Sequence, residues 1–196
     1  IGSRIISSLL KSGGDIAVGA MTILTSVMQF AMLPMQGVAQ GAQPILSFNF
    51  GAKNADRVKK TFRLLLTVCL AYSVVLWGII MLFPSVFAKM FASDASLVEF
   101  TSHALRIYCA VLCIFGIQIA CQMTFVSIGS AVCSIIVAVM RKFVLLIPLI
   151  YILPNFIADK TNAVYTAEPV ADALAVTFTL VLFVFRFGKE MKKLEA

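Results

Sequence analysis

No charged residue occurs between Ile16 and Phe50, and further long apolar runs follow this stretch. About 20 consecutive apolar residues in a helix suffice to cross the hydrocarbon core of a bilayer. The chain is 61% hydrophobic and 13% charged, with a mean hydropathy of +0.99, whereas soluble domains hold about 25% charged residues. A soluble core of this size cannot bury that excess. The composition predicts an all-α integral membrane protein and excludes a disordered tail, a secreted disulfide scaffold and an ordinary cytosolic enzyme.

Turn residues and charges divide this single bundle into five full spans and one partial span. Asn54 is expected to cap the helix that follows it, and Ser96, with Glu99 three residues later, to form a capping box at the start of the fourth span. The chain begins with Ile1 inside a helical pattern, so we expect a truncated first helix. The expected spans are 1–10 (partial), 16–50, 64–83, 97–128, 131–153 and 164–187.

The distribution of Lys and Arg predicts the orientation in the membrane. One loop and the C-terminal tail are rich in basic residues, whereas Lys11, Lys89 and Lys160 at the opposite ends each have an acid nearby. Cytoplasmic loops carry the excess of Lys and Arg, so we expect a multi-pass cell-membrane protein with a cytoplasmic C-terminus. The basic residues are Lys53, Arg57, Lys59, Lys60 and Arg63 in the loop and Arg186, Lys189, Lys192 and Lys193 in the tail.

Four glutamines interrupt the long uncharged stretch. Their spacings of 7, 4 and 3 residues place them on one face of a helix. An unpaired amide in hydrocarbon costs several kcal/mol, so this face meets protein or water. It forms either polar contacts between helices or the wall of an aqueous substrate cavity. The candidates are Gln29, Gln36, Gln40 and Gln43, and Gln118 and Gln122 repeat the pattern in the fourth span.

Three prolines fall inside expected spans. A proline within a helix removes one backbone hydrogen bond and bends or breaks the helix. We therefore expect Pro34 and Pro44 to bend the long helix and Pro148 to act as a further hinge.

Two carboxylates lie four residues apart near the start of the last span, at Glu168 and Asp172. They either complement the positive end of the helix dipole or form a cation or proton site, because intramembrane acids usually face a cavity or a partner. Two cations interrupt the preceding span. We expect Arg141 to pair with a carboxylate or with backbone carbonyls, and Lys142 to extend to the cytoplasmic interface.

The sequence offers no support for catalysis or metal binding. It contains no phosphate-binding glycine loop, no dinucleotide fingerprint and no nucleophile elbow. No metal-ligand spacing is present, and the five cysteines lie in apolar runs, which is typical of small apolar core residues. The basic residues form no single soluble face for nucleic acid. We expect no enzyme activity, no cofactor, no metal and no nucleic-acid partner.

Several motifs, in their order, resemble the multidrug and toxic compound extrusion (MATE) transporters. In the first part of the chain these are Gly13–Ala20, Pro34–Gly37, Gln40–Ile45 and Asn49–Ala52. Later, the Ile147–Pro154 run and the Ala167–Asp172 stretch resemble the end of the family's C-terminal half. The similarity covers nearly the whole chain.

The resemblance implies one lobe of a two-lobe transporter built from six-helix bundles. The missing N-terminal lobe and the lipid bilayer are then its partners. The implied activity is export of small organic, cationic compounds by alternating access, coupled to H⁺ or Na⁺. Some branches of the family place cation ligands on the first and fourth helices of this lobe. The fourth span here has no acid after Glu99, so the resemblance leaves Glu168 and Asp172 as coupling candidates.

Two alternatives to drug export stay open. A flippase for lipid-linked precursors shares the architecture, and its cavity requires basic groups for phosphates, for which Arg106 and Arg141 are the candidates. A non-transporting membrane interaction module instead pairs its amides between helices and leaves no gap accessible to water.

Overall fold

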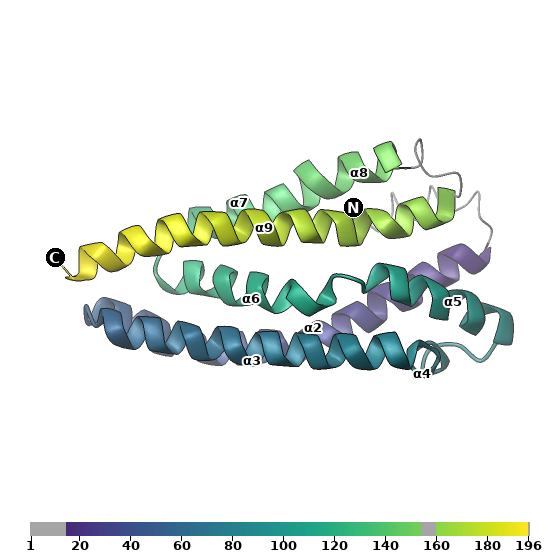
Figure 1. Ribbon diagram of the computed structural model, residues 1–196, viewed down its shortest axis with the longest axis horizontal. Helices are drawn as coiled ribbons and strands as arrows, with labels where there is room; N and C mark the ends of the chain where they lie inside the picture. The colour runs from purple at the N-terminus through teal and green to yellow at the C-terminus, as the bar shows by residue number, and fades with distance from the viewer. Residues whose placement is uncertain (1–14, 154–159, 196) are drawn as a thin grey trace.

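The computed structural model describes residues 15–153 and 160–195, and every regular element in these ranges is a helix. Four of the described helices are long and apolar enough to cross a membrane, and a bent pair makes a fifth candidate span. The helices lie roughly along one long axis, as Figure 1 shows. The all-α membrane bundle expected from the sequence is confirmed. The expected partial span at residues 1–10 lies outside the described residues.

The first two described helices are α2 (Asp15–Gly51) and α3 (Ala55–Leu82). Helix α2 runs unbroken with Pro34 and Pro44 inside it. Helix α3 begins well before the expected span at 64–83, because its N-cap is Asn54, whose side chain accepts a hydrogen bond from the Arg57 amide at 3.1 Å. The predicted cap at Asn54 is confirmed, and its amide acceptor satisfies one of the free N–H groups of the first turn.

The expected continuous span at 97–128 is instead two helices, α5 (Ala95–Tyr108) and α6 (Leu112–Ser127), which meet at 54°. A short helix, α4 (Pro84–Lys89), precedes them. Two side chains of α3 bond to backbone carbonyls beside the break. The Trp77 indole N–H donates to the Ala110 carbonyl at 3.1 Å, and the Ser73 hydroxyl donates to the Cys113 carbonyl at 2.9 Å. A broken helix in a membrane requires such partners for its freed backbone groups.

The capping box expected at Ser96 is wrong. Helix α5 begins at Ala95 with Asp94 as its N-cap residue, and the Ser96 hydroxyl donates to the Asp94 carboxylate at 2.7 Å. This hydrogen bond lowers the pKa of Asp94, which is fully exposed before the helix, below its ordinary value. Ser96 therefore stabilises the turn before α5 and does not bond to the backbone of the first helical turn.

The remaining chain forms α7 (Ala131–Val139), a π-helix η2 (Met140–Leu146), α8 (Ile147–Ile152) and α9 (Lys160–Glu195). Pro148 lies two residues after the end of the π-helix, in the first turn of α8. Because proline has no N–H to donate to the carbonyl four residues back, the α-helical bonding pattern cannot continue unchanged through this segment. Pro148, one of the three prolines expected to act as hinges, therefore lies close to an irregular helical segment, the π-helix η2.

The connection from α6 to α7 is a Schellman motif. The Ser130 amide donates to the Phe125 carbonyl at 2.9 Å, and the Gly129 amide donates to the Val126 carbonyl at 3.2 Å. Gly129 has a φ of +74°, a conformation that glycine adopts without steric cost. This geometry confirms the tight turn expected at Gly129 and Ser130.

Helix α6 occupies the centre of the bundle, between α3 and α9 (Figure 1). It approaches α3 so closely that a Cβ atom at Gly116 would lie 2.5 Å from the Cys69 carbonyl oxygen. On its other side, Phe125 of α6 packs edge-on against Phe183 of α9, and the Phe62 ring of α3 stacks on the same ring at 4.5 Å. These contacts fix the three helices relative to one another.

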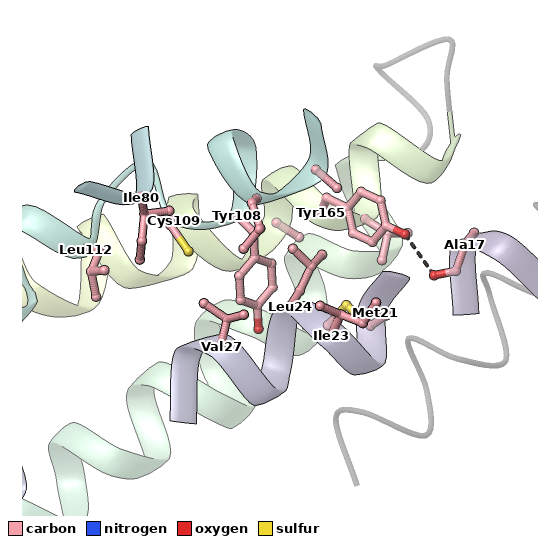
Figure 2. Close-up of a cluster of buried hydrophobic side chains, with 14 of the residues drawn as sticks. Ala17, Met21, Ile23, Leu24, Val27, Ile80, Tyr108, Cys109, Leu112 and Tyr165 are labelled. Carbon is pink, nitrogen blue, oxygen red and sulfur yellow. Dashed lines mark hydrogen bonds between the residues drawn. The ribbon is translucent and has the colours of Figure 1, made fainter. Parts of the chain in front are cut away.

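The two basic clusters lie at the same end of the bundle. Met191 and Leu194 of α9 pack beside Ala55 and Val58, at the start of α3, and Figure 1 shows the C-terminus next to the α2–α3 turn. At the opposite end, the Tyr165 hydroxyl donates to the Ala17 carbonyl at 2.9 Å and joins α9 to α2, as Figure 2 shows. This topology agrees with the grouping of basic residues expected from the sequence, and the cytoplasmic side stays a prediction.

Candidate functional site

Four charged side chains meet in the interior between η2 and α9. The Arg141 Nε atom lies 2.6 Å from Asp172 Oδ1, and an Arg141 terminal nitrogen lies 3.8 Å from Glu168 Oε1. The Lys142 ammonium lies 3.4 Å from the same Glu168 oxygen. We call Arg141, Lys142, Glu168 and Asp172 the charge cluster, and at full ionisation its four charges sum to zero.

Helix geometry explains how these side chains converge. Glu168 and Asp172 are four residues apart on α9 and therefore share one face. Arg141 and Lys142 are sequence neighbours, which point apart in an α-helix, but both lie within η2. The wider π-helical turn separates consecutive side chains by a smaller angle, and π-helical segments often occur at functional sites. The π-helix thus lets two adjacent cations reach the acids of α9.

Burial divides the cluster into a sealed pair and an open pair. Asp172 is 3% exposed, and Arg141 bonds to it while its guanidinium also lies 4.6 Å from the centre of the Phe115 ring. In the second pair, Glu168 is buried but the Lys142 side chain is 51% exposed. The predicted pairing of Arg141 with a carboxylate is confirmed. The Lys142 ammonium lies 3.4 Å from Glu168, and its expected extension to the cytoplasmic interface stays a prediction.

The helix-dipole interpretation of the two acids is wrong. Helix α9 begins at Lys160, so Glu168 and Asp172 lie beyond its first two turns, with Pro169 inside the helix. The dipole effect is confined to the first turn. The acids are instead compensated by the two cations of η2.

A hollow of about 460 Å³ adjoins the charge cluster, and we call it the charged hollow. Helix α2 contributes an apolar and amide-bearing wall, and the buried Tyr108 lines it from the end of α5. Figure 2 shows this tyrosine reaching toward α2 near Val27. The lining residues are Thr25, Met28, Gln29, Met32, Leu33, Gln36, Tyr108, Arg141, Lys142 and Glu168.

A second hollow, of about 320 Å³, adjoins the first, and we call it the amide hollow. The two share Met32, Gln36 and Arg141, so they form adjoining parts of one crevice along α2. The remaining lining residues of the amide hollow come from α2, α6 and α7: Ala39, Gln40, Phe115, Gln118, Ile119, Gln122, Met123, Val126 and Ser134.

Five of the six candidate glutamines line this crevice. Gln36 lines both hollows, Gln29 only the charged one, and Gln40 the amide hollow together with Gln118 and Gln122 of α6. Within the described residues, the buried Gln118 amide oxygen has no hydrogen-bond partner, although the side chain is only 3% exposed.

Gln43, the sixth, is half-buried and lines neither hollow. The polar stripe thus borders open space over most of its length, and its cavity role stays a prediction.

Sequence reasoning did not place Lys142 in the wall of the crevice, and it named Arg141 only as a carboxylate partner or a phosphate-binding candidate. Two adjacent cations inside an apolar run, together with two acids spaced by one helical turn, are the signal that could have indicated a shared site. A separate hollow of about 640 Å³ lies between α4 and α5 and contains Lys89 and Glu99. None of the predicted site residues lines it, although its volume exceeds that of the charged hollow and of the amide hollow.

Known multidrug export proteins match most of this chain in sequence. Multidrug export protein MepA of Staphylococcus aureus is 21% identical over 182 residues, which cover 93% of this chain and 40% of that protein. MepA of Staphylococcus haemolyticus is 22% identical over 175 residues, covering 88% of this chain and 38% of that protein. The chain therefore spans about two-fifths of the length of these relatives.

Solved structures of transporters share the fold. A structure of the MATE multidrug transporter DinF-BH, solved as a complex, superposes with a TM-score of 0.80 and 32% identity, over 93% of this chain and 41% of that one. A MATE crystal structure in the bent conformation gives a TM-score of 0.91 at 17% identity, over 100% of this chain and 43% of that one.

The family model described as MatE matches residues 1–152, which is most of the chain. The predicted resemblance is therefore confirmed on three independent comparisons of sequence and structure. The members found are membrane transporters, so the expectation of a transporter fragment in place of an enzyme agrees with them. The chain belongs to the MATE family of multidrug efflux transporters.

Proposed function

We propose that this chain forms one lobe of a cation-coupled antiporter that exports small organic compounds by alternating access. The observation that carries the proposal is the crevice along α2, where Gln36 joins the amide hollow to the charged hollow. Together the hollows supply several polar groups on a mainly apolar wall, which is the usual character of a small-molecule site. A second, N-terminal lobe is proposed to close the pathway from the other side, with the lobes rocking in the bilayer.

Glu168 is the better of the two candidates for the coupling ion, H⁺ or Na⁺. It lines the charged hollow, whereas Asp172 lies behind it and is bound to Arg141 at 2.6 Å. Two cations already neighbour Glu168, so a further metal cation would meet like charge there. A proton competes with the same two cations, because they stabilise the ionised carboxylate, so the proposal includes both H⁺ and Na⁺ as coupling ions.

The side chains that line the crevice favour drug export over a lipid-precursor flippase and over a non-transporting interaction module. A flippase cavity requires several cations available for phosphate, but Arg141 is paired with Asp172 and Arg106 lines neither hollow, which leaves Lys142 as a single exchangeable cation. An interaction module requires amides that are sealed between helices. Gln36 and Gln40 are instead exposed beside the crevice.

The test is export from proteoliposomes by the full-length transporter, driven separately by a pH gradient and by a Na⁺ gradient. We expect Gln40→Leu to lower drug export severalfold while protein abundance and melting temperature stay near the wild-type values. Gln43→Leu is the matched comparison on the same helix, and it should cost less export because Gln43 lines neither hollow. Equal loss of export and abundance in Gln40→Leu would indicate packing and not cavity lining.

A further inference from the structure

The open pair of the charge cluster faces the charged hollow with both signs of charge. Lys142 and Glu168 line the hollow, and the 3.4 Å between their charged atoms exceeds the roughly 2.7–2.9 Å of a strong charge-assisted hydrogen bond. Lys142 is also half-exposed, so packing does not confine its ammonium to this one partner. The pair therefore offers a donor and an acceptor to a bound molecule.

The other two members of the cluster are committed to each other. Arg141 bonds to Asp172 at 2.6 Å and stacks over the Phe115 ring. A molecule in the hollow gains little by competing with that buried, short ion pair. Arg141 also lines the hollow, but its short bond to Asp172 leaves Lys142 and Glu168 as the charged groups that exchange partners more readily.

We infer that the charged hollow prefers zwitterionic compounds, whose cationic group replaces Lys142 at Glu168 while their carboxylate binds Lys142. This inference rests on the proposed function and gives its substrate class. A simple monocation at Glu168 leaves Lys142 unpaired and adjacent to it, and two neighbouring like charges repel. A zwitterion instead exchanges one ion pair for two.

The rest of the hollow suits the apolar body of such a compound. Met28 and Met32 line it beside Leu33, and methionine side chains adapt to varied shapes. Its volume of about 460 Å³ lies in the range of drug-sized sites. The amides of Gln29 and Gln36 add neutral donors and acceptors at its edge.

Two dyes with the same body test the inference. Rhodamine 19 carries a free carboxylate beside its cationic ring system, and rhodamine 6G is its ethyl ester, a monocation. We expect the full-length transporter, measured by fluorescence anisotropy in detergent, to bind rhodamine 19 about tenfold more tightly than the ester. Lys142→Gln should weaken rhodamine 19 binding about tenfold, a change of about 1.4 kcal/mol, and should tighten ester binding, because it removes the like charge beside Glu168.

Lys89→Gln is the matched control, because Lys89 lies on α4, beside a different hollow. It should bind both dyes as the wild type does, and the melting temperatures of both variants report their folding. Export of the ester with no preference for rhodamine 19, or an equal effect of Lys142→Gln on both dyes, overturns the substrate class and leaves the proposed export standing. Absence of binding and export for both dyes contradicts the proposed function as well.

Discussion

Substituting Arg141 by glutamine should destabilise the protein far more than the same change at its neighbour Lys142. Arg141 Nε lies 2.6 Å from Asp172, which is 3% exposed. Two unit charges at that distance attract by about 6 kcal/mol at an effective dielectric constant of 20. Part of this attraction offsets the cost of desolvating both groups, and loss of one partner from a buried pair costs about 3–5 kcal/mol.

The neighbouring substitution has a smaller expected cost for a structural reason. Lys142 is 51% exposed and its contact with Glu168 is 3.4 Å long, and solvent-exposed ion pairs contribute about 0–1 kcal/mol. In Lys142→Gln, Glu168 also keeps an Arg141 nitrogen 3.8 Å away. The adjacent residue therefore provides a control in the same π-helix with the same change of charge.

The assay is thermal unfolding of the purified full-length transporter in detergent, followed by fluorescence. Arg141→Gln should lower the melting temperature by several degrees, and Lys142→Gln should lower it by much less. The double variant Arg141→Met with Asp172→Leu should recover most of the loss, because apolar replacement of both partners is often neutral or stabilising. Equal losses in Arg141→Gln and Lys142→Gln, or no recovery in the double variant, would refute the division into a sealed and an open pair.

Two further substitutions test backbone geometry, with unfolding of the full-length protein as the measurement. Gly116→Ala should destabilise the α3–α6 contact by about 1–3 kcal/mol, as overpacking does, because its Cβ would lie 2.5 Å from the Cys69 carbonyl oxygen; Gly78→Ala on α3, with no atom within 4 Å of its Cβ, should not. Gly129→Ala should cost about 1–2 kcal/mol because Gly129 has a φ of +74°, and a loss no greater than in Gly78→Ala contradicts the assigned turn.

The positions of most membrane-spanning helices were predictable because they depend on the hydrocarbon environment of the bilayer. Apolar runs of bilayer length and the turn residues between them place most of the helices, and Asn54 and Gly129 mark helix ends through local chemistry. The break between α5 and α6 was not predictable in this way. It contains no proline, and side chains of another helix, Trp77 and Ser73, satisfy the carbonyls beside it.

Most residues of the candidate site were predictable, as was the pairing of Arg141 with a carboxylate, but the contact of Lys142 with Glu168 was not. Spacing on one helix places glutamines on a common face, and it places Glu168 and Asp172 together. Whether a face borders a hollow depends on the neighbouring helices, which is why Gln40 lines the crevice and Gln43 does not. The position of Lys142 depends on the π-helix, whose i→i+5 bonding is rare and has no simple sequence signal.

The neutrality of the charge cluster bears on how such a wall can both bind and release a compound. A lone carboxylate in an apolar bundle is expensive to leave unpaired, so it would hold any cation that reached it. Glu168 already has Lys142 as a replaceable partner, and release of a bound group therefore restores an ion pair and does not expose a bare charge. The free-energy difference between the crevice with a bound compound and the empty crevice is smaller for that reason. Under the proposed function, such a small difference would help the carrier to alternate between loading and unloading, and the Arg141–Asp172 ion pair at 2.6 Å joins η2 to α9 beside the exchanging pair.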